Sequence, residues 1–303
     1  MNLSRTKLFW ISYFVVAVIL QIIAGNFPFS FFKFPLNLIL AILWIYGIWI
    51  LYKDNKNYGI SQIIMSSSAT FITILGVIIG SLVIGLFPQL SATDAESRAG
   101  ILARLGVYNF MSSWIFVSIL FALLTNLGMI TIRAYFLRKK HRWRFLMNHV
   151  GLWLLLGGGF IGSSDLQTLR IPVFANEESN VSFSLEGEKV YLGYDLKLKD
   201  FESEHYENGT PRKFEATVSI IEGDNVKDVK LMVNHPYQKN LGEDIYLTGY
   251  DTTKESPEYC IVQIVKQPWK YVQLSGILMA LIGAAGMFIG GPQKITNKDD
   301  KLG

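Results

Sequence analysis

Cysteine is almost absent from this sequence. Cys260 is the single cysteine among 303 residues, which excludes an internal disulfide, a CxxC redox motif and a cysteine-based metal site. Because Cys260 falls in a strand-like segment, we expect it to be a small buried core residue. A phosphate-binding glycine loop is also missing, since Gly157-Gly158-Gly159 lies inside an apolar run, where small residues let helices pack closely.

Charged residues are scarce as well, at 17% of the chain against roughly 25% in an ordinary soluble domain. Half of the residues are hydrophobic, which indicates a membrane protein. Crossing the ~30 Å hydrocarbon layer takes about 20 mostly apolar residues. Six segments meet this requirement: 8–25, 36–52, 63–87, 112–132, 145–162 and 271–290. The first is not a cleavable signal peptide, because Phe27-Pro28-Phe29 follows it in place of a small-residue cleavage site.

The distribution of basic residues predicts how the spans are oriented, because lysine and arginine in short loops resist translocation. Thirteen of them fall on one side: Arg5, Lys7, Lys53, Lys56, Arg133, Arg138, Lys139, Lys140, Arg142, Arg144, Lys294, Lys298 and Lys301. The short loops of the opposite side hold only Lys33, Arg98 and Arg104. Both termini should therefore face the cytoplasm. The net charge of +4 reflects these anchors and not a surface for nucleic acid.

The stretch between the last two spans has a different composition. Residues 164–270 are polar, and apolar and polar residues alternate at 181–185, 190–198, 213–220, 229–233 and 245–250, a pattern typical of strands. About seven strands predict a small antiparallel sandwich or barrel outside the cytoplasm. The expected fold is six transmembrane helices plus one extracytoplasmic all-β domain. Its parts are two N-terminal helices (1–62), three helices with a basic cytoplasmic loop at 133–144 (63–163), the β domain (164–270), and the last helix with a cytoplasmic tail (271–303).

His149 is the only histidine inside a predicted span. Ionisable side chains in a spanning helix are rare and costly, so each is a functional hypothesis. A packing histidine that hydrogen-bonds between helices is the alternative. The other histidines have plainer interpretations: His141 lies in the basic loop, His205 in a polar surface stretch and His235 in a turn before Pro236.

Several sequence segments, taken in order, resemble the ResB/CcsB family of cytochrome c biogenesis (system II) proteins. They lie at 80–89, 105–116, 123–127, 148–152 with 155–159, 201–214, 233–237 and 265–269. Together they cover about residues 63 to 292. The first two spans fall outside this region, and the exported domain is short for the family. The tryptophan-rich WWD signature and exported histidines of the partner CcsA family are missing. The chain therefore resembles one of the two subunits of such a complex.

The resemblance implies a function and a site. Such proteins, joined to a CcsA-type WWD-domain partner, carry haem across the bacterial inner membrane and attach it to CxxCH motifs of exported apocytochromes c. By this resemblance His149 would be an axial ligand to the iron of haem b, while Arg142, Arg144 and Trp153 could contact the haem or its propionates. For these three, topology anchoring and packing are the simpler roles.

Catalysis would be shared with the partner, since thioether formation needs chiefly positioning. Two other functions stay open. One is a structural assembly subunit that binds no haem. The other is a membrane transporter or sensor whose β domain binds an extracytoplasmic ligand, although no predicted span carries an acidic relay residue, the usual mark of a transport path.

Overall fold

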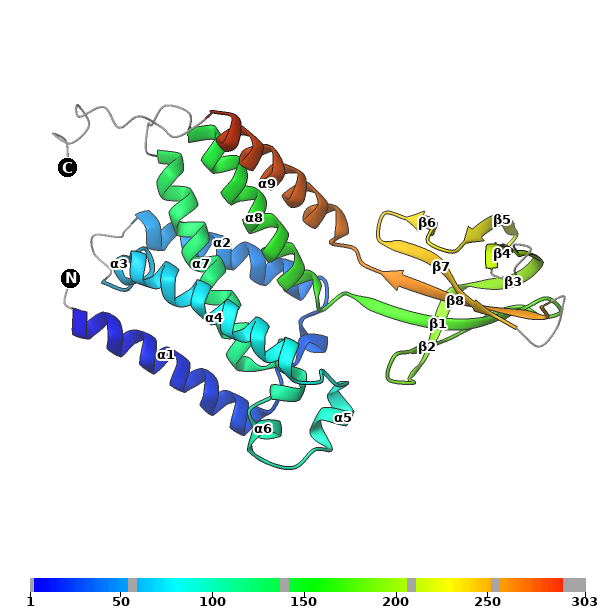
Figure 1. The fold of residues 1–303 in the computed structure, drawn as a ribbon, viewed down its shortest axis with the longest axis horizontal. Helices are drawn as coiled ribbons and strands as arrows, with labels where there is room; N and C mark the ends of the chain where they lie inside the picture. Colours follow the sequence, from blue (N-terminus) through cyan, green and yellow to red (C-terminus); the bar gives the residue numbers. More distant parts are fainter. Residues whose placement is uncertain (1–2, 54–58, 137–141, 206–210, 252–256, 291–303) are drawn as a thin grey trace. The chain divides into compact units, whose positions relative to one another are not determined.

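The computed structural model describes residues 3–53, 59–136, 142–205, 211–251 and 257–290. The chain divides into two compact units (Figure 1). One holds the helices and comprises residues 1–164 and 271–303, and the other holds the strands and comprises residues 165–270. Each unit is described by itself below.

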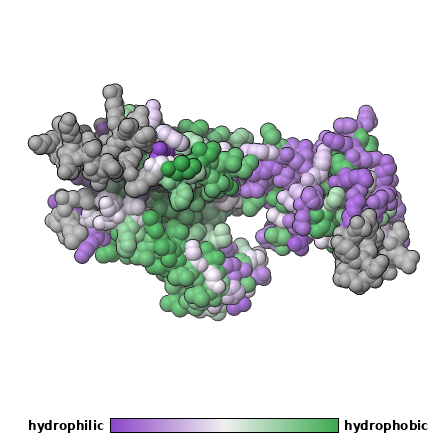
Figure 2. Space-filling model, turned by 45° about the horizontal axis from the view of Figure 1, so that its top comes forward, coloured by the Kyte–Doolittle hydropathy of each residue, from purple (hydrophilic) through white to green (hydrophobic). Residues whose placement is uncertain are grey.

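The helical unit contains the six expected spans. The helices long and apolar enough to cross a membrane are α1 (Leu3–Ala24), α2 (Leu36–Lys53), α4 (Ser67–Leu86), α7 (Trp114–Phe136), α8 (Arg142–Gly162) and α9 (Lys270–Gly290). Hydrophobic side chains cover the outside of this unit (Figure 2); Ile23 and Phe288, for example, are 78% and 91% exposed. Such a surface is stable against lipid and not against water, so the chain is a multi-pass membrane protein.

The third span is shorter than the sequence predicted, because the helix is interrupted before Ser67. A short helix, α3 (Gly59–Ile64), precedes the break. The Ser66 hydroxyl then accepts a hydrogen bond from the Ala69 backbone N–H at 3.2 Å, which caps α4. Four further short elements lie between spans: η1 (Phe29–Phe32), α5 (Ala92–Glu96), α6 (Ile101–Arg104) and η2 (Val107–Ser112).

Helix α7 is the central helix of its unit. It contacts α1, α2, α4 and α8, and 56% of its most apolar window is buried, against 11–22% in the other five spans. Asn126, 1% exposed, fastens α7 to its neighbours by donating to the Ile64 carbonyl at 2.5 Å and accepting from the Thr70 hydroxyl at 3.0 Å. These bonds satisfy a polar group that would be costly if left unpaired in a membrane.

The other unit is a single antiparallel sheet. Its strands are β1 (Gln167–Phe174), β2 (Ser179–Ser184), β3 (Lys189–His205), β4 (Pro211–Glu222), β5 (Asn225–Met232), β6 (Tyr237–Asn240), β7 (Glu243–Tyr250) and β8 (Tyr259–Lys266). They are ordered β5-β4-β3-β2-β1-β8-β7-β6. The all-β, antiparallel part of the expectation is thus confirmed. The sandwich or barrel form is not, because the eight strands form one open sheet among the described residues.

One face of this sheet carries the core. Every second residue of the longest strand points inward at Leu192, Tyr194, Leu196 and Leu198, as the two-residue period of a strand requires. Cys260 is fully buried in the same cluster, as expected from the sequence. Polar residues dominate the outer surface of the unit (Figure 2).

Candidate functional site

Helix α8, which bears His149, lies directly against α9 because glycine backbones meet there. A Cβ atom on Gly151 would overlap the backbone of Ala280 and Gly276, and one on Gly283 would overlap the backbone of Asn148. The Asn148 amide donates to the Ala280 carbonyl at 3.1 Å. Small residues that let backbones touch are a typical means of helix association in membranes, so this face of α8 is fixed to α9.

A second contact fastens α8 to α7 and α2. The Trp153 indole N–H donates to the Leu124 carbonyl at 3.0 Å, and its ring lies 5.6 Å from that of Trp44. A Cβ atom on Gly128 would come within 3.2 Å of the Trp153 Nε1, so the glycine lets the indole lie close to α7 without a shift. In this arrangement Trp153 is a packing residue between helices.

His149 lies one turn before Trp153 and is half-buried. Its Nδ1 is 3.0 Å from the Phe145 carbonyl oxygen, and its ring stacks on the Phe145 ring with the centroids 3.6 Å apart. Because a carbonyl can only accept, Nδ1 carries the proton in this bond. In the neutral ring the lone pair then lies on Nε2, and no hydrogen bond of Nε2 is found within the described part of the chain.

This arrangement suits a metal ligand. Ligating histidines commonly donate their other ring N–H to a carbonyl, which fixes the tautomer and the ring orientation. Phe145 supplies that carbonyl from the preceding turn of the same helix. The sequence interpretation overlooked Phe145, although residues four apart on a helix are neighbours and that spacing would have identified it.

No cluster of metal-binding side chains surrounds His149 among the described residues. The described residues contain no group of three or more His, Cys, Asp or Glu that could hold a metal ion. His235 is exposed in a turn of the β unit, whereas His141 and the side chain of His205 lie outside the described residues. Within the described residues, His149 would thus contribute one ligand and not a metal site of its own.

The structure does not bring Arg144 to the face that bears His149. A Cβ atom on Gly290 would overlap the Arg144 guanidinium, so this cation lies at the C-terminal end of α9, where helix dipoles favour positive charge. Five helical positions separate Arg144 from His149, which amounts to roughly 140° around the helix. The side chain of Arg142, the other arginine expected near the site, lies outside the described residues.

The helical unit also has an open apolar cavity of about 670 Å³, lined by residues of α1, η1, α2, α7 and α8. Aromatic rings dominate its wall, among them those of Phe29, Trp44, Trp114 and Phe160. A cavity of this size could hold a small molecule. Its described lining includes no histidine, cysteine or methionine, so it offers iron none of these ligands.

Comparisons with known proteins relate part of the chain to a family. No curated protein sequence matches the chain. Among solved structures, a protein titled "Cytochrome c Heme Lyase CcmF" is similar, with 12% sequence identity and a TM-score of 0.35; the match covers 71% of this chain and 33% of that one. This chain therefore spans about a third of that protein's length. A model of the ResB-like family matches residues 139–261, a stretch that includes His149 and most of the β unit. Over those residues the expected resemblance is confirmed, and the chain matches the ResB-like family.

Proposed function

We propose that the chain serves cytochrome c biogenesis as a ResB/CcsB-like subunit of a system II cytochrome c synthase. It would help to carry haem across the bacterial inner membrane and present it to CxxCH motifs of apocytochromes c. The observation that carries this proposal is His149, which lies within the stretch that matches the ResB-like family and whose Nδ1 is hydrogen-bonded to the Phe145 carbonyl.

In this proposal His149 would hold the iron of haem b through its Nε2 lone pair. The haem supplies the vinyl groups that become thioethers; this chain supplies orientation. The Phe145 carbonyl holds the imidazole in the ligating tautomer, and the Phe145 ring, stacked on it, restrains its rotation. The contact of Gly151 with α9 keeps that turn of α8 in place. No residue of this chain is assigned a proton transfer or a nucleophilic step.

A further iron ligand and much of the haem pocket would come from a CcsA-type partner with a WWD domain. A half-buried His149 suits a haem shared between two proteins better than one enclosed by this chain. For Arg142, whose side chain lies outside the described residues, the propionate contact stays a proposal. An Arg144 contact would require its guanidinium to leave Gly290. Trp153 would shape the pocket from behind, through its packing on Trp44.

The orientation that we propose places both termini in the cytoplasm and the β unit outside, where it would meet the partner or the apocytochrome. His149 then lies near the cytoplasmic end of α8, as suits a site that receives haem made inside the cell. A structural subunit without haem is the competing function. It is favoured by the stacking of the His149 ring on the Phe145 ring, because a histidine that only packs makes such a contact as well.

Absorption spectra of the full chain test the proposal. The chain is purified with native lipids, alone and together with the neighbouring CcsA-type protein, as wild type, His149→Ala and, for a matched control, His235→Ala. We expect a haem Soret band in the wild type and in His235→Ala. In His149→Ala the band should be lost or shifted, and added imidazole should restore it, because a free imidazole can take the vacant coordination position.

Unchanged spectra in His149→Ala would leave the chain a scaffold. Absence of haem from every preparation, with and without the partner, would reopen the transporter or sensor function.

A further inference from the structure

The open apolar cavity of the helical unit lies between α1 and α2, two consecutive spans that pack on a common neighbour. Both helices contact α7, and the described parts of α1 and α2 make no extended contact with each other. Residues of η1 and the end of α8 complete the wall. His149 does not line this cavity, and the proposed handling of haem makes no use of it.

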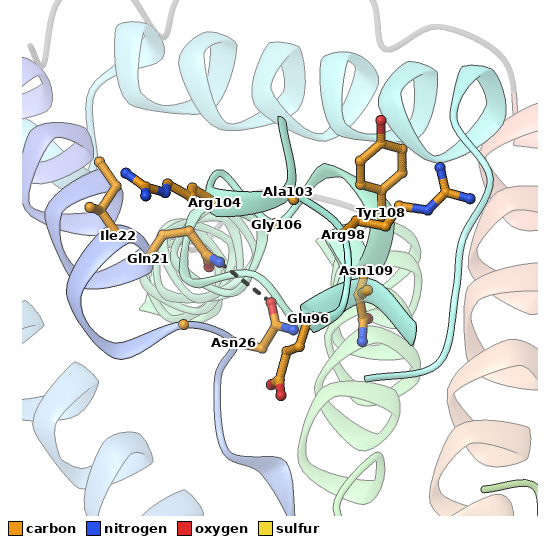
Figure 3. A pocket seen from close by; sticks show the side chains of 12 residues that line it. Gln21, Ile22, Asn26, Glu96, Arg98, Ala103, Arg104, Gly106, Tyr108 and Asn109 are labelled. Atoms are coloured by element: carbon orange, nitrogen blue, oxygen red, sulfur yellow. Dashed lines mark hydrogen bonds between the residues drawn. The ribbon is translucent and has the colours of Figure 1, made fainter. Parts of the chain in front are cut away.

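Several hydrogen bonds hold α1 in its place beside the cavity. Gln21, 2% exposed, accepts from the Trp114 backbone N–H at the start of α7 at 2.9 Å. Its amide donates to Asn26 at 3.4 Å, a bond drawn in Figure 3. About two turns earlier on α1, the Tyr13 hydroxyl donates to the Ser118 carbonyl at 2.8 Å. Helix α1 is thus fixed to α7 both at its end and near its middle.

Helix α2 is held by contacts of its own. The Trp44 indole N–H donates to the Thr125 hydroxyl at 3.1 Å, and the Trp44 ring stacks on the Phe121 ring with the centroids 5.1 Å apart. The Asn37 amide donates to the Ile161 carbonyl of α8 at 3.3 Å. Because α1 and α2 are anchored independently of each other, the space between them is part of the fold.

The cavity opens within the apolar layer and not at its surface. Leu43 of α2 and Phe121 of α7 line it and are 58% and 42% exposed. Each is the eighth residue of its helix, which places it about 10 Å from the start of that helix. Ile42, next to Leu43, is 58% exposed as well. At this depth of a spanning unit such side chains face hydrocarbon, so the mouth of the cavity meets lipid tails and not water.

The lining disfavours a charged or strongly polar occupant. Its described residues include no Asp, Glu, Lys or Arg, and half of them are aromatic. The tyrosine, asparagine and Trp44 donors described above bond within the protein, and Ser118 and Ser164 add one hydroxyl each. The Trp114 indole N–H has no partner in the described chain, but it is buried and cannot be reached from the cavity. Apolar contact remains, which suits neither the carbonyls of a quinone nor the propionates of haem.

We propose that this cavity holds an acyl chain of a membrane phospholipid, inserted between α1 and α2 against α7, with the headgroup outside the cavity. An empty cavity would deprive its walls of the dispersion contacts that an occupant supplies, and hydrocarbon is the medium at its mouth. Flat aromatic walls offer an acyl chain a large contact area and need no hydrogen bond from it. The lipid therefore replaces the helix–helix contact that α1 and α2 lack, and its tail decides its binding.

Native mass spectrometry of the full chain, purified in detergent, tests this assignment. Wild type, Ala41→Phe and Ala284→Phe are titrated with phosphatidylglycerol or phosphatidylcholine. Ala41 lines the cavity and is 7% exposed, so phenylalanine fills part of the space. Ala284 is the matched control, since it is exposed on α9 and does not line the cavity. We expect wild type and Ala284→Phe to retain one lipid, equally well with either headgroup, and Ala41→Phe to bind it about tenfold more weakly.

Equal retention by Ala41→Phe and the wild type would overturn the proposal. A preference of tenfold or more for phosphatidylglycerol would overturn it as well, because recognition would then lie in the headgroup. Displacement of the lipid by an equimolar short-chain quinone would show that the cavity takes a ring and not an acyl chain.

Tryptophan fluorescence gives a second test that does not depend on the folding of Ala41→Phe. A phospholipid with brominated acyl chains quenches the tryptophans that it contacts, and Trp44 and Trp114 line the cavity. At one lipid per chain, we expect Trp44→Phe/Trp114→Phe to lose most of the quenching seen in the wild type. Trp143→Phe should keep it, since Trp143 is 49% exposed and lies outside the lining. Equal quenching in the two variants would place the lipid elsewhere and contradict the proposal.

Discussion

At the scale of single residues, the β unit contains a buried carboxylate that depends on one hydroxyl. Tyr194, 6% exposed, donates its hydroxyl to Glu243, 8% exposed, and Asn240 donates to the other carboxylate oxygen at 3.2 Å. Tyr194→Phe leaves that carboxylate one donor short inside the protein. We expect the free energy of unfolding to fall by about 1–3 kcal/mol, measured by thermal unfolding of the full chain in detergent. Tyr191→Phe is the control, because Tyr191 on the same strand is 72% exposed; an equal loss in both variants would contradict this account.

The same pair predicts a dependence on pH. Burial, and then the hydrogen bond to Glu243, raise the pKa of Tyr194 well above its usual value of 10. Because the pKa of Tyr194 is higher in the folded chain, its hydroxyl makes its full contribution to the free energy of unfolding below pH 10. This contribution is lost as pH rises beyond 10, since the tyrosine releases its proton first in the unfolded chain. Stability should therefore decline more steeply above pH 10 in the wild type than in Tyr194→Phe. Parallel declines in the two proteins, followed by circular dichroism, would show that Tyr194 has no part in it.

At the scale of secondary-structure elements, the position of α8 depends on a backbone contact with α9. Gly151→Val would force a side chain into the backbone of Ala280 and Gly276, and overpacking of this kind costs about 1–3 kcal/mol. Gly159→Val on the same helix is the matched control, since a Cβ atom there meets nothing within 4 Å. We expect Gly151→Val to lower the thermal midpoint of the full chain in detergent and Gly159→Val to change it little. Equal midpoints for the two variants would mean that α8 and α9 do not pack as closely as described.

Some secondary-structure elements could be predicted from the sequence and others could not. The six spans followed from apolar composition, because lipid demands some 20 apolar residues wherever a helix crosses it. The strand at Gln167–Phe174 is not among the stretches named from the sequence, although Leu169, Ile171 and Val173 alternate into the core. The open sheet order could not be read from the chain, because periodicity gives strands but not their partners. His149 was identified because it is the only histidine in a predicted span. The contact of the Arg144 side chain with Gly290 could not be predicted, because α9 is distant from Arg144 in the sequence.

At the scale of the whole molecule, the proposed orientation is open to a direct test that the lone cysteine makes simple. Cys260 is fully buried, and burial raises the pKa of its thiol to about 12. Because the thiolate is the reactive form, the unaltered chain should not react with a membrane-impermeant maleimide at pH 7, even in permeabilised cells. Single cysteines placed elsewhere then report their own side of the membrane.

Three exposed positions distinguish the two sides: Lys53 at the end of α2, Ala99 in the loop between α4 and α7, and Glu186 in a turn of the β unit. If the thirteen basic residues of one side hold it in the cytoplasm, intact cells should label Ala99→Cys and Glu186→Cys, and Lys53→Cys should react only after permeabilisation. The reverse pattern would move His149 to the outer end of α8 and remove the reason to regard it as the point where haem enters. Labelling of Glu186→Cys without Ala99→Cys would contradict the six-span order itself, because α7 and α8 lie between these positions and return the chain to the side from which it came.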